Sequence, residues 1–168
     1  MLRLAYSYSS EITDKYLESL EDEHFKYFNT TGWNEYNIIN NDNFNNIQYV
    51  SVDNNDNVIG IIFFEVNRYT KVVTNIGIIN FEKRNNITFS KDVLKAIDKV
   101  FSIGFNKMEW NVVTENTRAM NIYDKFINTY GGLEVGILHE TIMIEGKMYD
   151  KKLYELSKSN WTKNYRRR

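Results

Sequence analysis

Asn116, Ala119 and Tyr123 follow one another at spacings of three and four residues, at the start of a helix predicted over 117–130. At this spacing the three side chains share one face of the helix. We expect that face to point at the end of the preceding predicted strand, 108–113. A tyrosine hydroxyl placed there can donate a proton to a leaving group. The competing interpretation is that Tyr123 is a core aromatic residue with its hydroxyl at the rim.

The residues after Tyr123 extend this pattern. Those at characteristic positions are Gly131, Gly132, Gly136, His139, Glu140, Gly146, Asp150 and Tyr154. Taken with Asn116, Ala119 and Tyr123, they resemble the GNAT superfamily of N-acetyltransferases, in particular the branch of ribosomal-protein N-terminal acetyltransferases. The resemblance covers residues 47–161 and includes the order of the predicted elements. It implies that an amine attacks the thioester of acetyl-CoA and that Tyr123 assists the departing thiolate, because tyrosine has an ordinary pKa of about 10 and a thiol one of about 8.5.

The resemblance also implies a binding site for coenzyme A. In the family, backbone amides in the turn between the fourth strand and the next helix hold the pyrophosphate at a helix N-terminus. A backbone amide near Ile79 would polarise the thioester carbonyl. The implied coenzyme contacts are Ile79, Phe81, Asn85, Asn86, Ile87, Thr88, Phe89, Ser90, Lys91 and Asn116.

The pyrophosphate turn departs from the family pattern. With a helix that begins at Ser90, the turn is 85–90, and it lacks the family's glycine. Glycine permits a close backbone approach and a positive φ without strain. Because strain at one such position costs about 1 to 3 kcal/mol, we expect coenzyme binding to be weakened about 5- to 100-fold. Lys83, Arg84 and Lys91 bring compensating positive charge. An ordinary polar loop followed by a serine N-cap is the competing interpretation.

No general base stands out in the sequence. The family often has a carboxylate on the fourth strand, where this chain has Asn75. Four glutamates remain as candidates without a specific argument for any of them: Glu65, Glu82, Glu109 and Glu140. We expect His139 to be a surface or interface histidine and His24 to be a boundary residue on its helix. Without a positioned base, an α-amine of ordinary pKa about 7.8 should react more readily than a lysine side chain of about 10.4.

Composition narrows the classes of function. The 168 residues include no cysteine and two histidines, which excludes disulfides, thiolate metal sites and a cysteine nucleophile, so we expect no metal. A formal net charge of −1 gives no global attraction for a nucleic acid, and we expect none as a partner. Residues 1–14 lack an apolar stretch after a basic start, and no apolar run is long enough to cross a membrane. We therefore expect a cytoplasmic protein with an amine acceptor as its partner; a homodimer is compatible with the sequence.

Hydrophobic periodicity predicts one α/β (α+β) domain. Strands are predicted over 2–6, 47–53, 58–67, 72–81, 108–113, 133–144 and 149–157. Helices are predicted from Ser9 or Ser10 to Phe28, around 33–39, over 90–103 and over 117–130. In the third helix Asp92 is expected on the polar face. This order predicts a GNAT-like domain with a mixed, twisted sheet of six to seven strands, splayed between strands four and five, and about four flanking helices.

Charge is uneven along the chain. Residues 11–24 hold six acids and one lysine, whereas residues 151–168 hold seven bases and one acid. The acidic run could draw a cationic acceptor toward a pocket lined by Tyr27, Phe28, Trp33 and Tyr36, although a solvated helix face is the simpler explanation. We assign 1–161 to the domain and 162–168 to a basic C-terminal tail.

The leading functional prediction is acetyl-CoA-dependent N-acetylation of an amine, either a protein or peptide α-amine or a small amine. The alternative is a GNAT-fold binding or interaction module that has lost catalysis. Asn75 and the missing glycine favour the module, whereas Asn116 and Tyr123 favour the enzyme.

Overall fold

The computed structural model describes residues 1–27 and 44–165. The chain forms two compact units. The first unit contains Met1–Glu65 and Gly77–Ser102, and the second contains Val66–Ile76 and Ile103–Arg168.

The described strands form a sheet in the order β1-β2-β3-β4-β5-β7-β6. The strands are β1 (Leu2–Leu4), β2 (Asn46–Val52), β3 (Val58–Asn67), β4 (Val72–Asn80), β5 (Lys107–Val113), β6 (Leu133–Ile144) and β7 (Lys147–Ser157). β4 and β5 pair in parallel, Val72 with Lys107 and Val73 with Met108. The pairs β1–β2, β2–β3, β5–β7 and β6–β7 are antiparallel. The prediction of a mixed sheet of six to seven strands is confirmed.

Four α-helices lie in the described part of the chain: α1 (Ser9–Leu20), α2 (Ile87–Ser102), α3 (Thr117–Tyr130) and α4 (Lys158–Tyr165). Two short 3₁₀ turns, Ala5–Tyr8 and Glu23–Phe25, flank α1. The bounds of α3 are those predicted. The predicted serine cap of α1 is wrong, because the first 3₁₀ turn leads directly into the helix and Tyr8 holds the cap position without a side-chain bond. α4 was not predicted from the sequence.

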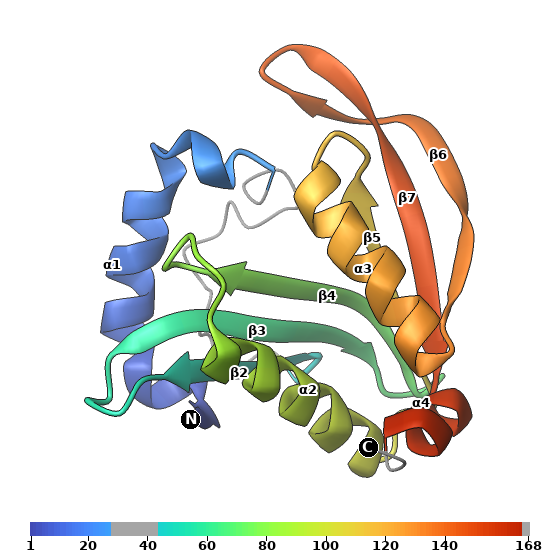
Figure 1. Cartoon of the computed structure of the whole chain (residues 1–168), viewed down its shortest axis with the longest axis horizontal. Coiled ribbons are helices and arrows are strands. Elements are labelled where there is room, and N and C mark those ends of the chain that lie inside the picture. Colours follow the sequence, from blue (N-terminus) through green and yellow to red (C-terminus); the bar gives the residue numbers. More distant parts are fainter. Residues whose placement is uncertain (28–43, 166–168) are drawn as a thin grey trace. The chain divides into compact units, whose positions relative to one another are not determined.

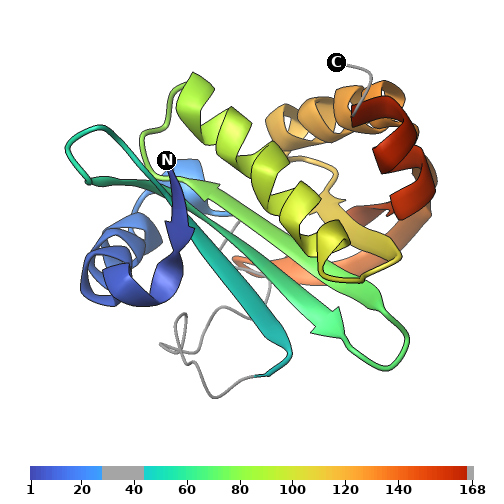
Figure 2. The same cartoon turned by 90° about the horizontal axis from the view of Figure 1, so that it is seen from below.

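In the first unit, α1 and α2 lie on opposite faces of the strands (Figure 2). The core on the α1 side includes Ile12 and Tyr16 of α1 together with Val50, Val52 and other strand residues. On the α2 side, Gly60 of β3 lies under the ring of Phe89. A Cβ on Gly60 would lie 2.6 Å from that ring and 2.3 Å from the carbonyl oxygen of Ile79. Glycine at this position therefore lets α2 pack closely onto the sheet.

Asp92 of α2 is fully buried, so the prediction that it lies on the polar face is wrong. Its carboxylate accepts a hydrogen bond from the Ser51 hydroxyl at 2.8 Å and lies 3.2 Å from the Met1 ammonium and 3.2 Å from Nζ of Lys95. Hydrophobic periodicity places such a residue by its polarity alone, whereas paired charges can be buried.

In the second unit, α3 packs against β5 and β7 (Figure 1). α3 ends at Gly131, which adopts the left-handed conformation with φ 77° that glycine accepts without a Cβ penalty. The side chains of Asn160 and Asn164 in α4 donate to the carbonyl oxygens of Gly131 at 2.7 Å and Tyr130 at 3.0 Å. α4 also buries Trp161, so it closes the end of this unit.

Several predictions concern residues outside 1–27 and 44–165: the helix around 33–39, the pocket residues Phe28, Trp33 and Tyr36, and the last three arginines. Over the two described ranges, no helix is long and apolar enough to cross a membrane. No cluster of metal-ligating side chains occurs in the same residues.

Candidate active site

Tyr123 lies in an aromatic cluster of the second unit. Its ring packs at an angle against Trp110 and Tyr154, with 6.0 Å and 5.8 Å between ring centroids. Trp110 and Tyr154 are buried and stack on each other at 5.5 Å. These contacts hold the Tyr123 ring against β5 and β7, because aromatic pairs at such distances and angles attract each other.

The hydroxyl of Tyr123 has no hydrogen-bond partner among the described residues, although the side chain is half-buried. Burial raises the pKa of Tyr123 to about 12. The phenol is therefore protonated at neutral pH and can act only as a donor to a developing anion. A hydroxyl that is partly exposed and has no protein partner is free to contact a ligand.

The hydroxyl of the neighbouring Tyr154, unlike that of Tyr123, has a hydrogen-bond partner in the described part of the structure. It donates to Oδ1 of Asp124 at 2.8 Å, and Nζ of Lys152 donates to the same oxygen at 2.8 Å. Lys152 also pairs with Glu134 at 2.9 Å. The hydrogen bond from Lys152, assisted by the one from Tyr154, holds the pKa of Asp124 below its usual value. This network ties α3 to β7 one residue away from Tyr123, and it leaves Tyr154 without a free hydroxyl.

Asn116 and Ala119 form the start of α3. Oδ1 of Asn116 accepts the backbone N–H of Ala119 at 3.2 Å, which makes Asn116 the N-cap. This bond satisfies one of the first N–H groups of the helix, which have no partner within it. Asn116 and Ala119 therefore form the start of the helix. Of the three residues on the predicted face, Tyr123 is the one whose side chain carries a group that can donate a proton. A coenzyme contact for Asn116 stays a prediction.

The loop before α2 differs from its prediction. α2 begins at Ile87, and Oδ1 of Asn86 accepts the N–H of Phe89 at 3.0 Å. The predicted start at Ser90 is wrong because Asn86 provides an earlier cap. Ser90 is already in the first turn, and its N–H donates to the carbonyl of Asn86 at 3.0 Å. The connection in front of the helix is therefore 81–86.

The first turn of α2 begins with two exposed residues. The N–H groups of Ile87 and Thr88 have no acceptor within the helix, and both residues are exposed. Such amides, together with the positive end of the helix dipole, suit an anion.

The connection 81–86 is held by polar side chains that the sequence analysis missed. Asn80 donates to the carbonyl of Arg84 at 2.7 Å and accepts from the N–H of Glu82 at 3.0 Å. The Glu82 carboxylate accepts from Nδ2 of Asn86 at 2.8 Å. Lys83 has φ 57° and pairs with Asp22. A carboxylate thus lies beside the cap of α2, where the predicted site called only for positive charge. The spacing of Asn80, Glu82 and Asn86 could have indicated this turn, since Asn and Asp side chains often bond the backbone two residues on.

The remaining predicted coenzyme residues fall into two groups. Ile79 and Phe89 are buried, and the N–H of Phe81 donates to the carbonyl of Ile59 at 3.0 Å. Asn85, Ser90 and Lys91 are exposed. The amide of Phe81 is therefore occupied, while the exposed group surrounds the start of α2.

The residues considered for the role of general base differ in their burial and in their partners. Asn75 is half-buried in β4 and has no carboxylate to offer. Glu82 is engaged with Asn86, and Glu109 pairs with Lys107. His139 is exposed, as predicted.

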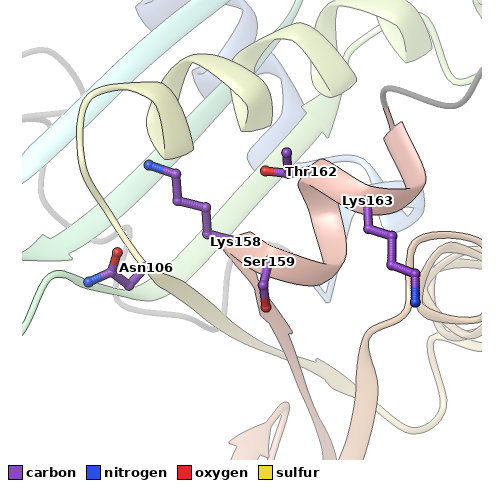
Figure 3. Close-up of a pocket in the computed structure, with 5 residues that line it drawn as sticks. All are labelled: Asn106, Lys158, Ser159, Thr162 and Lys163. Carbon is purple, nitrogen blue, oxygen red and sulfur yellow. The ribbon is translucent and has the colours of Figure 1, made fainter.

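A surface hollow at α4 is lined by Asn106, Lys158, Ser159, Thr162 and Lys163 (Figure 3). The side chains of Lys158 and Lys163 point away from each other (Figure 3). Their ammonium groups therefore do not converge on one anion. None of the residues that the sequence analysis assigned to coenzyme binding or catalysis lines this hollow.

No family model matches the sequence, and no curated protein matches it. Solved structures do match. The crystal structure of the spermidine N-acetyltransferase from Vibrio cholerae in complex with CoA and spermine is similar over 96% of this chain and 97% of that chain, with a TM-score of 0.72 and 19% identity. A point mutant of the same SpeG enzyme covers 96% of this chain and 96% of that chain, with a TM-score of 0.70 and 22% identity.

A chimera of the Vibrio cholerae enzyme with hSSAT covers 73% of this chain and 71% of that chain, with a TM-score of 0.64 and 23% identity. Sequence identities of 19 to 23% support a shared fold only. The mixed sheet, the order of its elements and the similarity to these N-acetyltransferase structures together establish that the chain has a GNAT-like fold.

Proposed function

We propose that the protein is an acetyl-CoA-dependent N-acetyltransferase that transfers an acetyl group to an amine, with Tyr123 as the proton donor to the departing sulfur. The observation that carries this proposal is the Tyr123 hydroxyl, half-buried and unpaired among the described residues, on the helix where the resemblance predicts it. A phenol with a pKa of about 12 stays protonated until negative charge develops on the sulfur beside it. Its contribution is therefore a hydrogen bond that strengthens as the carbon–sulfur bond breaks.

For the coenzyme, we propose the first turn of α2 as the pyrophosphate site. The amides of Ile87 and Thr88 would hold the phosphates. Lys91 and Arg84 would contribute positive charge, although Arg84 also lies 3.5 Å from the Glu82 carboxylate. Glu82 opposes the binding of an anion, since it adds a negative charge beside the cap. We expect a dissociation constant in the micromolar to sub-millimolar range, weaker than a glycine-containing loop would give.

For the acceptor, we propose an amine that loses its proton easily. An α-amine, of ordinary pKa about 7.8, is favoured over a lysine side chain of about 10.4, because presenting the neutral amine at pH 7 costs about 1 kcal/mol in the first case and about 4.6 in the second. Spermine, which one similar structure contains, is a small-amine alternative.

The test is a titration of the protein with acetyl-CoA by isothermal calorimetry, followed by a thiol-release assay with three acceptors. These are a peptide with a free α-amine, a blocked peptide with one lysine, and spermidine. Binding and turnover with any amine would support the enzyme. Faster turnover of the blocked lysine peptide near neutral pH would contradict the acceptor preference.

A second candidate function is a binding module that has lost catalysis. Glu82 beside the α2 cap is the observation that favours it. This candidate predicts neither heat nor a thermal shift at millimolar acetyl-CoA, so the same titration separates the two functions.

A further inference from the structure

The hairpin of β6 and β7 carries a histidine–aspartate pair. Nδ1 of His139 lies 2.8 Å from Oδ2 of Asp150. The other carboxylate oxygen of Asp150 accepts the backbone N–H of Glu140, also at 2.8 Å. The Glu140 hydrogen bond and then the His139 hydrogen bond hold the pKa of Asp150 below its usual value. Asp150 is therefore an anion near neutral pH and can only accept.

This contact determines the tautomer of His139. Because the partner of Nδ1 is an acceptor, Nδ1 must carry the proton when the imidazole is neutral. Nε2 is then the unprotonated nitrogen. The His139 side chain is 78% exposed, so Nε2 is accessible to a substrate. A carboxylate that holds one imidazole nitrogen and leaves the other as an acceptor is the arrangement of a general base.

The backbone around His139 is shaped for this contact. The register of β6 against β7 shifts between Leu138 and Ile142, and Glu140 inside this bulge has φ 49°. A non-glycine residue in that conformation costs about 1 kcal/mol or more. The bond from Asp150 to the Glu140 N–H offsets part of this cost and brings His139 onto the same carboxylate. β-Bulges commonly redirect side chains next to active sites.

The pair lies close to the start of α3. The backbone N–H of Thr114, directly after β5, donates to the carbonyl of Asp150 at 3.0 Å. Two residues further on is Asn116, the N-cap of the helix that carries Tyr123. The hairpin of β6 and β7 extends past the carboxyl end of β5 and the first turn of α3 (Figure 1).

We propose that His139 is the general base of the acetyl transfer and that Asp150 is its positioning residue. This inference rests on the proposed function. The base is then a residue that the sequence predicted to be a surface or interface histidine, next to the candidate Glu140 on the same strand.

Acetyl transfer to an ammonium acceptor releases one proton in total. The acceptor ammonium loses one proton to Nε2 of His139, and its lone pair forms the bond to the thioester carbonyl carbon. The carbon–sulfur bond breaks, and the sulfur leaves with that electron pair and takes up the Tyr123 proton. The second proton released by the nitrogen restores the phenol, and His139 returns its proton to solvent. The products are an amide, a free thiol and one proton.

The kinetic test uses the full chain with acetyl-CoA and the fastest acceptor of the three-amine panel, from pH 5.5 to 9. His139→Gln should lower kcat/KM at pH 7 by about 100-fold or more and leave the acetyl-CoA dissociation constant unchanged. The deficit should shrink toward pH 9, where more of the amine is already neutral. Asp150→Asn should cause a smaller loss.

His24→Gln is the control. It replaces the other histidine, which is exposed, and should match the wild type. Charged groups near the pair are Lys151 on β7, Glu140 on β6 and Glu115 after β5, and they are kept in every variant.

A second readout does not depend on turnover. Imidazole ¹⁵N shifts of the two histidines, assigned with His24→Gln, should show His139 with the proton on Nδ1 in the wild type, and a loss of this preference in Asp150→Asn. An Nε2-protonated His139 in the wild type would overturn the proposal. So would His139→Gln with wild-type kcat/KM at every pH, a result that leaves the N-acetyltransferase function standing. A wild type that neither binds acetyl-CoA nor releases thiol would instead overturn the proposed function, and the base with it.

Discussion

Asp92 of α2 and Tyr123 of α3 are both polar side chains on otherwise apolar helix faces. They differ in whether their polar atoms have partners in the protein. The carboxylate of Asp92 is fully buried and contacts Ser51, Lys95 and the Met1 ammonium. The hydroxyl of Tyr123 is half-buried and has no hydrogen-bond partner in the described part of the chain.

This difference predicts that Asp92 contributes to stability and that Tyr123 contributes to function. A buried charge with several partners holds its own unit together, and removing it leaves the buried Ser51 hydroxyl unsatisfied. A hydroxyl without a protein partner adds little to folding and remains available to a substrate. The two residues should therefore respond to substitution in opposite ways.

Asp92→Ala should give the largest change. We expect the free energy of unfolding to fall by about 1 to 3 kcal/mol, because the substitution leaves the buried Ser51 hydroxyl without its acceptor. Chemical denaturation monitored by tryptophan fluorescence measures this loss. The matched control is Asp14→Ala, at an exposed aspartate of α1, which should change stability by less than about 0.5 kcal/mol. Equal stability of the two variants would remove the structural role of Asp92.

Tyr123→Phe should have the reverse signature. We expect the catalytic rate to fall by about 10- to 1,000-fold, since general acid catalysis is typically worth about 10² to 10⁴. Stability and acetyl-CoA affinity should stay near those of the wild type, because the ring contacts with Trp110 and Tyr154 are kept. Tyr69→Phe, at a fully exposed tyrosine, serves as the control. A loss of affinity in step with the rate would make Tyr123 a binding residue rather than an acid.

The two helix caps test the comparison at the two helix starts. Asn86→Ala and Asn116→Ala each remove a bond from a side-chain oxygen to the third residue of a helix, worth about 1 kcal/mol. In a chain of this size that corresponds to a fall in Tm of about 2 to 4 °C. Asn86→Ala also removes the bond from Asn86 to the Glu82 carboxylate. We expect Asn86→Ala to change the acetyl-CoA dissociation constant and Asn116→Ala to change turnover. Serine at either position should restore the cap. The same functional change from both variants would show that the two helices do not have separate roles.

Glu82→Gln should produce the smallest effect. The amide keeps an oxygen that can accept from Asn86 and removes one negative charge beside the α2 cap. We expect acetyl-CoA to bind about 3- to 10-fold more tightly, an effect of about 1 kcal/mol that added salt should reduce. Glu18→Gln on the exposed face of α1 is the control. Unchanged affinity at low salt would exclude the first turn of α2 as the pyrophosphate site.

The sequence predicted α3 better than α2, for a physical reason. α3 has the N-cap Asn116 three residues before Ala119, at the spacing of the recognised pattern, so its start is well defined. Before α2 the candidates Asn85, Asn86 and Ser90 compete, and the choice depends on Glu82, which holds the side chain of Asn86. Helix boundaries depend on such contacts, which hydrophobic periodicity does not register.

The candidate site could also be predicted only where the sequence pattern, rather than a contact between distant residues, identifies a residue. Tyr123 could be selected from its spacing within a recognisable pattern. The contact between His139 and Asp150 could not, because the two residues lie on different strands and meet through a bulge that shifts the register of β6. α4 was missed because its apolar pattern is weak, and its stability comes from Trp161 and two asparagines that contact another helix.

These two asparagines have a mechanical consequence for Tyr123. Asn160 and Asn164 tie the C-terminal end of α3 to α4, whereas the bond of Asn116 lies within the first turn of α3 itself. An anchor at the C-terminal end opposes sliding of α3 past α4. The helix that carries Tyr123 is therefore secured by a segment more than 25 residues further along the chain.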